Sequence, residues 1–128
     1  MSKATFIVVL TIPGKTTAEE LGASLNELVE EAKGGRVTGV LVDVTALSKN
    51  EKRFHEIGEA TGPRARTEID PELYKLGVKK IAFVSPSGKY PGRDKTAPPV
   101  SKGPIKKKGA PHKHYFKSPT TAINWLRS

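Results

Sequence analysis

The sequence contains no cysteine, few aromatic residues and no long apolar run. Without cysteine it can form no disulfide, no thiolate metal site and no thiol nucleophile, and a reducing compartment is the expected setting. No stretch approaches the roughly 18 apolar residues that a membrane-spanning helix needs. The apolar stretch 6–10 is too short and too β-branched for a signal peptide. We therefore expect a cytoplasmic protein without a transmembrane segment.

Acidic residues are nearly absent from one part of the chain. Between Ser85 and Lys117 there are nine Lys or Arg residues and one acid, Asp94, which gives this segment +8 of the whole-chain net charge of +9. The rest of the chain has 13 basic and 12 acidic residues. A nearly neutral body therefore carries one cationic segment, which favours polyanionic partners such as nucleic acid, anionic lipid surfaces or acidic proteins.

Three apolar, β-branched stretches predict strands: 5–11, 37–44 and 80–84. Their nearly continuous apolar character is typical of strands buried on both faces of a sheet. A shorter stretch, 113–116, could form a fourth strand.

Helical spacing of apolar residues separates these strands. The first helix is expected over 17–33, with Thr17 and Glu20 forming a capping box. A short helix over 50–61 should end at Gly62-Pro63, and Asp70 should cap a second short helix. A final helix should begin after Ser118-Pro119.

The order of these elements predicts a single α/β domain over residues 1–128, with a parallel or mixed sheet of about four strands and helices packed on it. Residues 86–112 show no apolar period and many Pro and Gly residues, so we expect them to form an extended basic loop. A loop of that length inside a small domain is typically functional or disordered.

Several of these motifs resemble the STAS / SpoIIAA-like family. The resemblance is carried by the helix 17–33, by Val-Leu-Val-Asp-Val ending the strand at 40–44, and by Lys-Ile-Ala-Phe-Val at 80–84. The most specific part is the ending, Tyr-Phe-Lys-Ser at 115–118 followed by Ala-Ile-Asn-Trp-Leu at 122–126. The resemblance as a whole covers most of the chain outside the basic segment. The resemblance implies a small α/β regulatory fold that binds other proteins.

The best-known members of that family are antagonists of anti-sigma factors that carry a phosphorylatable serine in an Asp-Ser-Ser-Gly-type turn. Here Asp43 leads instead into Val-Thr-Ala-Leu-Ser, so the resemblance leaves only Thr45 and Ser48 as possible phosphorylation sites.

No catalytic set is recognisable, and we expect a protein that is not an enzyme. Gly14-Lys15 lies between a strand and a helix, but Val9 stands where a phosphate-binding loop needs glycine. Asp43 ends a buried strand, where ligands bind in open α/β sheets, and it could act as a base, accept a phosphate or cap a turn. No second carboxylate, serine–histidine pair or cysteine accompanies it.

His112 and His114 could share one strand face, but a zinc site needs three or four ligands, and His55 is distant in the sequence. We therefore expect no metal and no cofactor. Arg64 and Arg66 lie in the predicted loop and could extend the positive surface.

The aromatic residues divide into two groups. Tyr115, Phe116 and Trp125 have core spacing, whereas Tyr90 lies among cations and turn formers, where it could stack on a base.

The leading hypothesis is a non-enzymatic binding or regulatory module whose cationic loop engages a polyanion, either RNA, DNA or an acidic protein. Lysines on an extended loop would hold phosphates without reading bases, so binding should be strongly salt-dependent. The expected polyanion-binding residues are Lys89, Tyr90, Arg93, Lys95, Lys102, Lys106, Lys107, Lys108 and Lys113.

Three alternatives remain open. The first is an anti-sigma-factor-antagonist-type switch controlled at Thr45 or Ser48, which would have a regulatory protein partner. The second is a protein that binds a lipid surface or a small ligand. The third, for which the sequence offers least, is an enzyme that uses Asp43. The sequence indicates no oligomeric state.

Overall fold

The computed structural model describes residues 6–85 and 108–128 of the chain. In these ranges the elements, in chain order, are β1 (Phe6–Thr11), α1 (Ala18–Ala32), β2 (Val37–Asp43), α2 (Thr45–Ser48), α3 (Glu51–Arg64), the π-helical turn η1 (Ala65–Ile69), α4 (Asp70–Lys75), β3 (Lys80–Val84), β4 (His112–Phe116) and α5 (Pro119–Arg127).

The four described strands form one sheet in the order β1-β2-β3-β4, and every neighbouring pair is parallel. The last residues of the strands lie in register: Thr11 is opposite Asp43, Asp43 opposite Val84, and Val84 opposite Phe116. Parallel strands need crossover connections, which the helices after β1 and β2 provide. The predicted α/β class is therefore confirmed, with a sheet that is parallel throughout.

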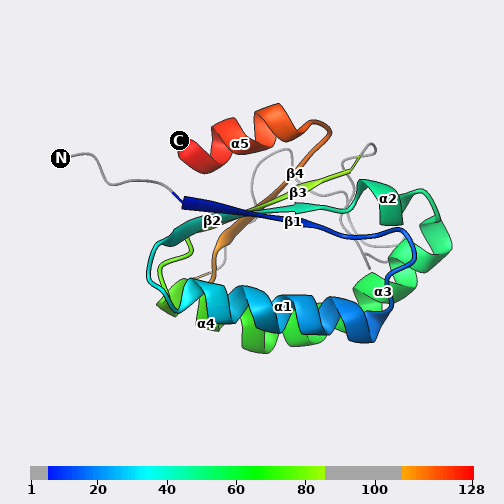
Figure 1. The fold of residues 1–128 in the computed structure, drawn as a ribbon, viewed down its shortest axis with the longest axis horizontal. Helices are drawn as coiled ribbons and strands as arrows, with labels where there is room; N and C mark the ends of the chain where they lie inside the picture. The colour runs from blue at the N-terminus through cyan, green and yellow to red at the C-terminus, as the bar shows by residue number, and fades with distance from the viewer. Residues whose placement is uncertain (1–5, 86–107) are drawn as a thin grey trace.

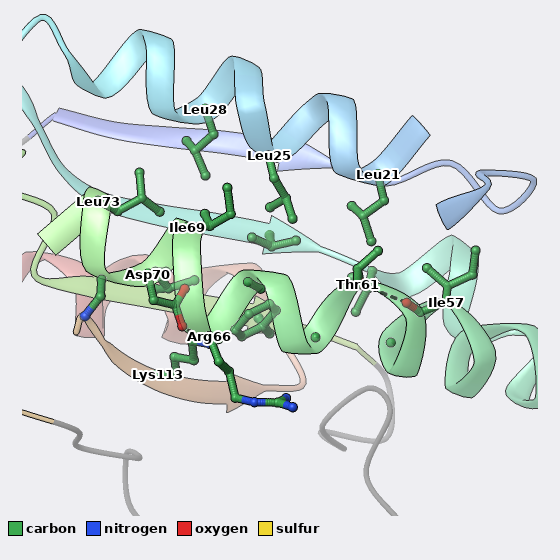
Figure 2. A pocket seen from close by; sticks show the side chains of 18 of the residues that line it. Leu21, Leu25, Leu28, Ile57, Thr61, Arg66, Ile69, Asp70, Leu73 and Lys113 are labelled. Carbon is green, nitrogen blue, oxygen red and sulfur yellow. Dashed lines mark hydrogen bonds and ion pairs between the residues drawn. The ribbon is translucent and has the colours of Figure 1, made fainter. Parts of the chain in front are cut away.

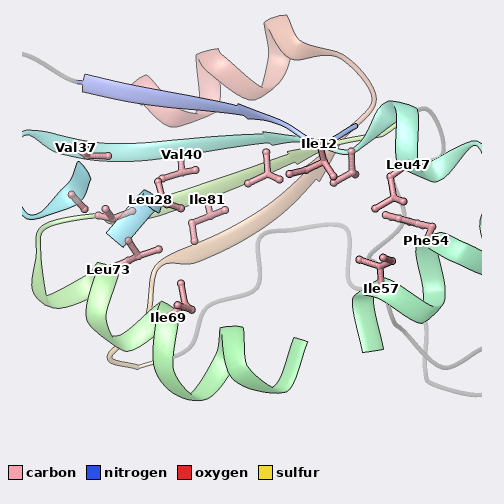
Figure 3. Close-up of a cluster of buried hydrophobic side chains, with 14 residues drawn as sticks. Ile12, Leu28, Val37, Val40, Leu47, Phe54, Ile57, Ile69, Leu73 and Ile81 are labelled. Carbon is pink, nitrogen blue, oxygen red and sulfur yellow. The ribbon is translucent and has the colours of Figure 1, made fainter. Parts of the chain in front are cut away.

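Helices cover both faces of this sheet. Figure 1 shows α1, α3 and α4 on one face and, of the described helices, α5 on the other. The larger apolar cluster lies between the sheet and the helices α1, α3 and α4 (Figure 3). The smaller cluster lies under α5, and its buried members are Leu41, Ala82, Val84, Ala122 and Leu126. Side chains alternate between sheet faces, so Val40 and Val42 join the larger cluster whereas Leu41 joins the smaller one.

β1 is less buried than its composition suggests. It is an edge strand, and Phe6 and Val9 are 47% and 58% exposed. The prediction that this strand is buried on both faces was therefore wrong, because composition alone does not distinguish an edge strand from a central one.

Two helix starts follow their sequence signals. The Thr17 hydroxyl accepts a hydrogen bond from the Glu20 N–H at 3.1 Å, and the Ser118 hydroxyl accepts one from the Thr121 N–H at 3.4 Å. Both contacts satisfy amides that the first helical turn leaves without a partner. The predicted beginnings of α1 and α5 are confirmed.

The region between β2 and β3 differs from the prediction. α3, η1 and α4 follow one another without a break, and Pro63 lies inside α3. We expected the helix to end at Gly62-Pro63. The helical run continues because Ile69 and Leu73 are buried against the sheet. The free energy gained by this burial offsets the cost of the hydrogen bond that proline cannot make.

η1 accommodates a second proline. In a regular α-helix the ring of Pro71 would clash with the carbonyl four residues earlier, whereas the wider π turn gives it room. The Asp70 N–H accordingly bonds to the carbonyl of Ala65, five residues back. Asp70 thus lies within the helical run and is not the N-cap that we predicted.

Candidate ligand pocket

A pocket of about 380 Å³ lies between the helices and the sheet (Figure 2). Leu21, Leu25 and Leu28 of α1 line one wall, and Ile57, Ile69 and Leu73 of the α3–η1–α4 run line another. The volume falls within the range of about 300–1,000 Å³ that is typical of small-molecule sites.

The apolar stripe of α1 borders the pocket. Leu28 and Ala32 are buried against the sheet, whereas Leu21 and Leu25, on the same stripe, are only half-buried. The N-terminal half of α1 therefore presents leucines that the core does not fully cover. The sequence pattern predicted the stripe but could not show that part of it borders a cavity.

The floor of the pocket includes two stacked aromatic rings. Phe83 of β3 and Tyr115 of β4 are register partners, and their ring centroids lie 4.7 Å apart with an angle of 10° between the planes. Both residues line the pocket. Tyr115 is buried, so the prediction that it belongs to the interior is confirmed.

An ion pair lies at the edge of this floor. The Lys113 ammonium is 2.5 Å from the Asp70 carboxylate, and the two side chains are 20% and 7% exposed. The pair joins α4 to β4, which are distant in the sequence. Burial of either charge alone would be costly, so each depends on the other.

Arg66 borders the same pocket with an exposed side chain. Its guanidinium passes over Gly62, where an added Cβ would lie 2.9 Å from Arg66 Nη1. Arg64 differs, because its guanidinium bonds to Glu68 at 2.9 Å and to the Asn26 side chain at 2.5 Å. The two arginines, which we had placed together in a loop, therefore lie on the helical run in different surroundings.

Asp43 has a local structural role. One of its carboxylate oxygens accepts a hydrogen bond from the Thr45 N–H at 3.0 Å, which fixes the turn from β2 into α2. This hydrogen bond matches one of the roles considered for Asp43, that of capping a turn.

The two possible phosphorylation sites lie on α2. Thr45 and Ser48 are half-buried, and the Ser48 hydroxyl donates to the Thr45 carbonyl at 2.9 Å. Modification of either residue stays a prediction.

Most of the predicted polyanion-binding residues lie outside the described residues, namely Lys89, Tyr90, Arg93, Lys95, Lys102, Lys106 and Lys107. Lys108 is exposed in the turn before β4. Lys113 is largely buried, and the carboxylate of Asp70 already matches its charge.

His114 faces the other side of the sheet. Its ring lies 4.5 Å from that of Phe116 and 5.6 Å from that of Trp125, centroid to centroid, beneath α5. Burial lowers the pKa of His114, because the charged form loses hydration in this apolar setting. Phe116 and Trp125 pack against the smaller apolar cluster, as their spacing predicted.

Within residues 6–85 and 108–128, no group of three or more His, Cys, Asp or Glu side chains is arranged to hold a metal ion. Across the same ranges, none of the helices combines the length and apolar character that crossing a bilayer requires.

Comparisons with known proteins identify no relative. No protein-family model matches this chain, and neither a curated protein nor a solved structure gives a significant match. The geometry of the pocket is therefore the main basis for a functional conclusion.

Removing one partner of the Asp70–Lys113 pair should destabilise the fold. We expect Lys113→Met and Asp70→Asn each to lower the free energy of unfolding by about 2 kcal/mol, because the remaining partner stays buried without its counterpart. Urea unfolding measures the loss. The matched control is the exposed Glu30–Lys33 pair, where Lys33→Met should change the stability much less, because water screens both charges. Equal effects at the two pairs would contradict the structural role of Asp70–Lys113.

Acidification should weaken the fold through His114. Its pKa is lowered on folding, so the unfolded chain binds the proton more readily, and stability falls as the pH drops from about 6.5 towards the folded-state pKa. At pH values above this range, the contribution of neutral His114 to stability is fully present. Urea unfolding across pH should show a smaller loss in His114→Phe than in the original chain, and NMR titration of the ring should give a pKa below its ordinary value. Identical pH profiles for the two chains would refute this assignment.

Proposed function

We propose that this protein is a non-enzymatic binding module that holds a small, largely apolar ligand between its helices and its sheet. The observation that carries the proposal is the pocket of about 380 Å³, with three leucines of α1 on one wall and the Phe83–Tyr115 stack in its floor. Binding of an apolar ligand there is favourable because both surfaces leave water.

The nature of the lining supports binding over catalysis. The carboxylate of Asp70 is paired with Lys113, and Asp43 caps a turn elsewhere. Neither acid is placed as a free general base in the pocket. We extend the proposal to the family level: the motifs that resemble STAS / SpoIIAA-like proteins form strands and helices in the expected order, which supports a related scaffold.

The charge distribution favours a second candidate function. Nine basic residues against one acid between Ser85 and Lys117 would suit a polyanion such as RNA.

Filling the pocket should abolish ligand binding without unfolding the protein. We expect Leu25→Trp to weaken binding of decanol, a neutral apolar probe, at least tenfold, because the indole would occupy part of the volume. NMR titration gives the affinity, and urea unfolding checks that stability changes by less than the roughly 1–3 kcal/mol that overpacking a closed core costs. Glu27→Trp, at an exposed position of α1 outside the pocket lining, is the control and should bind decanol normally. If decanol shifts no resonance of pocket residues in the original chain, the proposal fails.

The polyanion hypothesis requires a lysine-dependent effect of salt. Replacing four lysines of the basic segment by glutamine should weaken binding to an RNA homopolymer and flatten its dependence on salt, because fewer counterions are released. The four positions are Lys89, Lys102, Lys106 and Lys107. A control with the same change in net charge replaces Lys33, Lys49, Lys52 and Lys75, which are exposed on the body. Fluorescence titration at several salt concentrations that shows equal losses in both variants would assign binding to general charge.

A further inference from the structure

Among the described residues, the charges that line the pocket do not balance. That part of the lining contains one carboxylate, Asp70, and two cations, Lys113 and Arg66. Asp70 and Lys113 neutralise each other at 2.5 Å. The positive charge of Arg66, at the rim of the pocket, is not matched by an acid in this part of the lining.

No partner among the described residues accounts for the position of Arg66. Within the described part of the chain, no hydrogen bond or ion pair involves its guanidinium, whereas Arg64 is held by Glu68 and Asn26. Figure 2 shows Arg66 at the same edge of the pocket as Asp70 and Lys113, one helical turn from Asp70. An exposed guanidinium thus stands where an apolar cavity meets solvent.

Gly62 contributes to this placement. A side chain there would begin 2.9 Å from Arg66 Nη1, so the absence of a Cβ leaves room for the guanidinium against the helix. The position does not need glycine for a left-handed backbone, because Gly62 does not have a positive φ.

We propose that the pocket takes an apolar monocarboxylate, with its hydrocarbon part among the leucines and its carboxylate against Arg66. This inference rests on the proposed ligand-binding function and specifies the chemistry of the ligand. A guanidinium fork matches the two oxygens of a carboxylate. One negative charge balances the unmatched charge of Arg66, whereas a cationic ligand would meet two positive side chains and one acid that is already paired.

Three ten-carbon probes that differ in their polar end test the proposal: decanoate, decanol and decylammonium. Each is titrated into the full chain by NMR, at neutral pH and below the concentration at which it forms micelles. We expect decanoate to bind about three- to tenfold more tightly than decanol, because it adds a charge-assisted hydrogen bond at a partly solvated rim. Decylammonium should bind least tightly.

Substitution at Arg66 should remove only the preference for the acid. In Arg66→Gln the affinity for decanoate should fall to that for decanol, and the affinity for decanol should stay unchanged. Arg36→Gln makes the same change at an exposed arginine outside the pocket lining and should leave both affinities unchanged. Gly62→Ala should also reduce the preference for decanoate, because the new methyl group displaces the guanidinium, while the helical run stays intact.

The outcomes distinguish a failure of the proposed ligand-binding function from a failure of the role assigned to Arg66. If none of the probes binds, the proposed function and this inference both fail. If decanol binds as tightly as decanoate, the pocket binds apolar ligands but the role of Arg66 is wrong. If Arg36→Gln lowers the affinity for decanoate as much as Arg66→Gln does, general electrostatic attraction accounts for the preference and the inference is overturned.

Discussion

The attachment of β4 to the helical layer depends on the ion pair between Asp70 and Lys113. Among the described strands, β4 lies at an edge of the sheet beside β3, and the pair joins it to α4 on the face that α1 and α3 also cover. Both residues of the pair also line the pocket. A buried pair of this kind contributes little net stability relative to apolar residues, but it penalises any arrangement that separates the charges. It therefore specifies the position of α4 over β4 and, with it, the shape of the cavity.

Much of the architecture could be predicted from local sequence signals. Strand composition, the Thr17 and Ser118 caps and the periodicity of α1 and α5 depend on neighbouring residues, and the structure confirms each of them. The helix break at Pro63 was predicted wrongly because the local cost of proline is offset by burial of residues further along the run. The edge position of β1 was missed for a similar reason, since strand order is a property of the whole sheet.

The candidate site could be predicted less well than the fold. Its lining includes residues of α1, α2, the α3–η1–α4 run and three strands, and no short motif links these segments. Lys113 illustrates the difficulty. In the sequence it extends a run of cations, whereas in the fold its position on β4 directs it towards Asp70. Strand alternation could have indicated that Lys113 shares a sheet face with Tyr115, but not which acid would be opposite.

The exposed side of β1 has a consequence for the behaviour of the protein in concentrated solution. Its six residues carry no charge, and in the described part of the chain no strand pairs with its outer edge. Unprotected edges of this kind favour aggregation by intermolecular strand pairing. A net charge of +9 opposes such encounters through mutual repulsion, so the surplus of lysine and arginine also acts as a colloidal stabiliser. Concentrated salt would screen that repulsion and make the molecules more prone to associate.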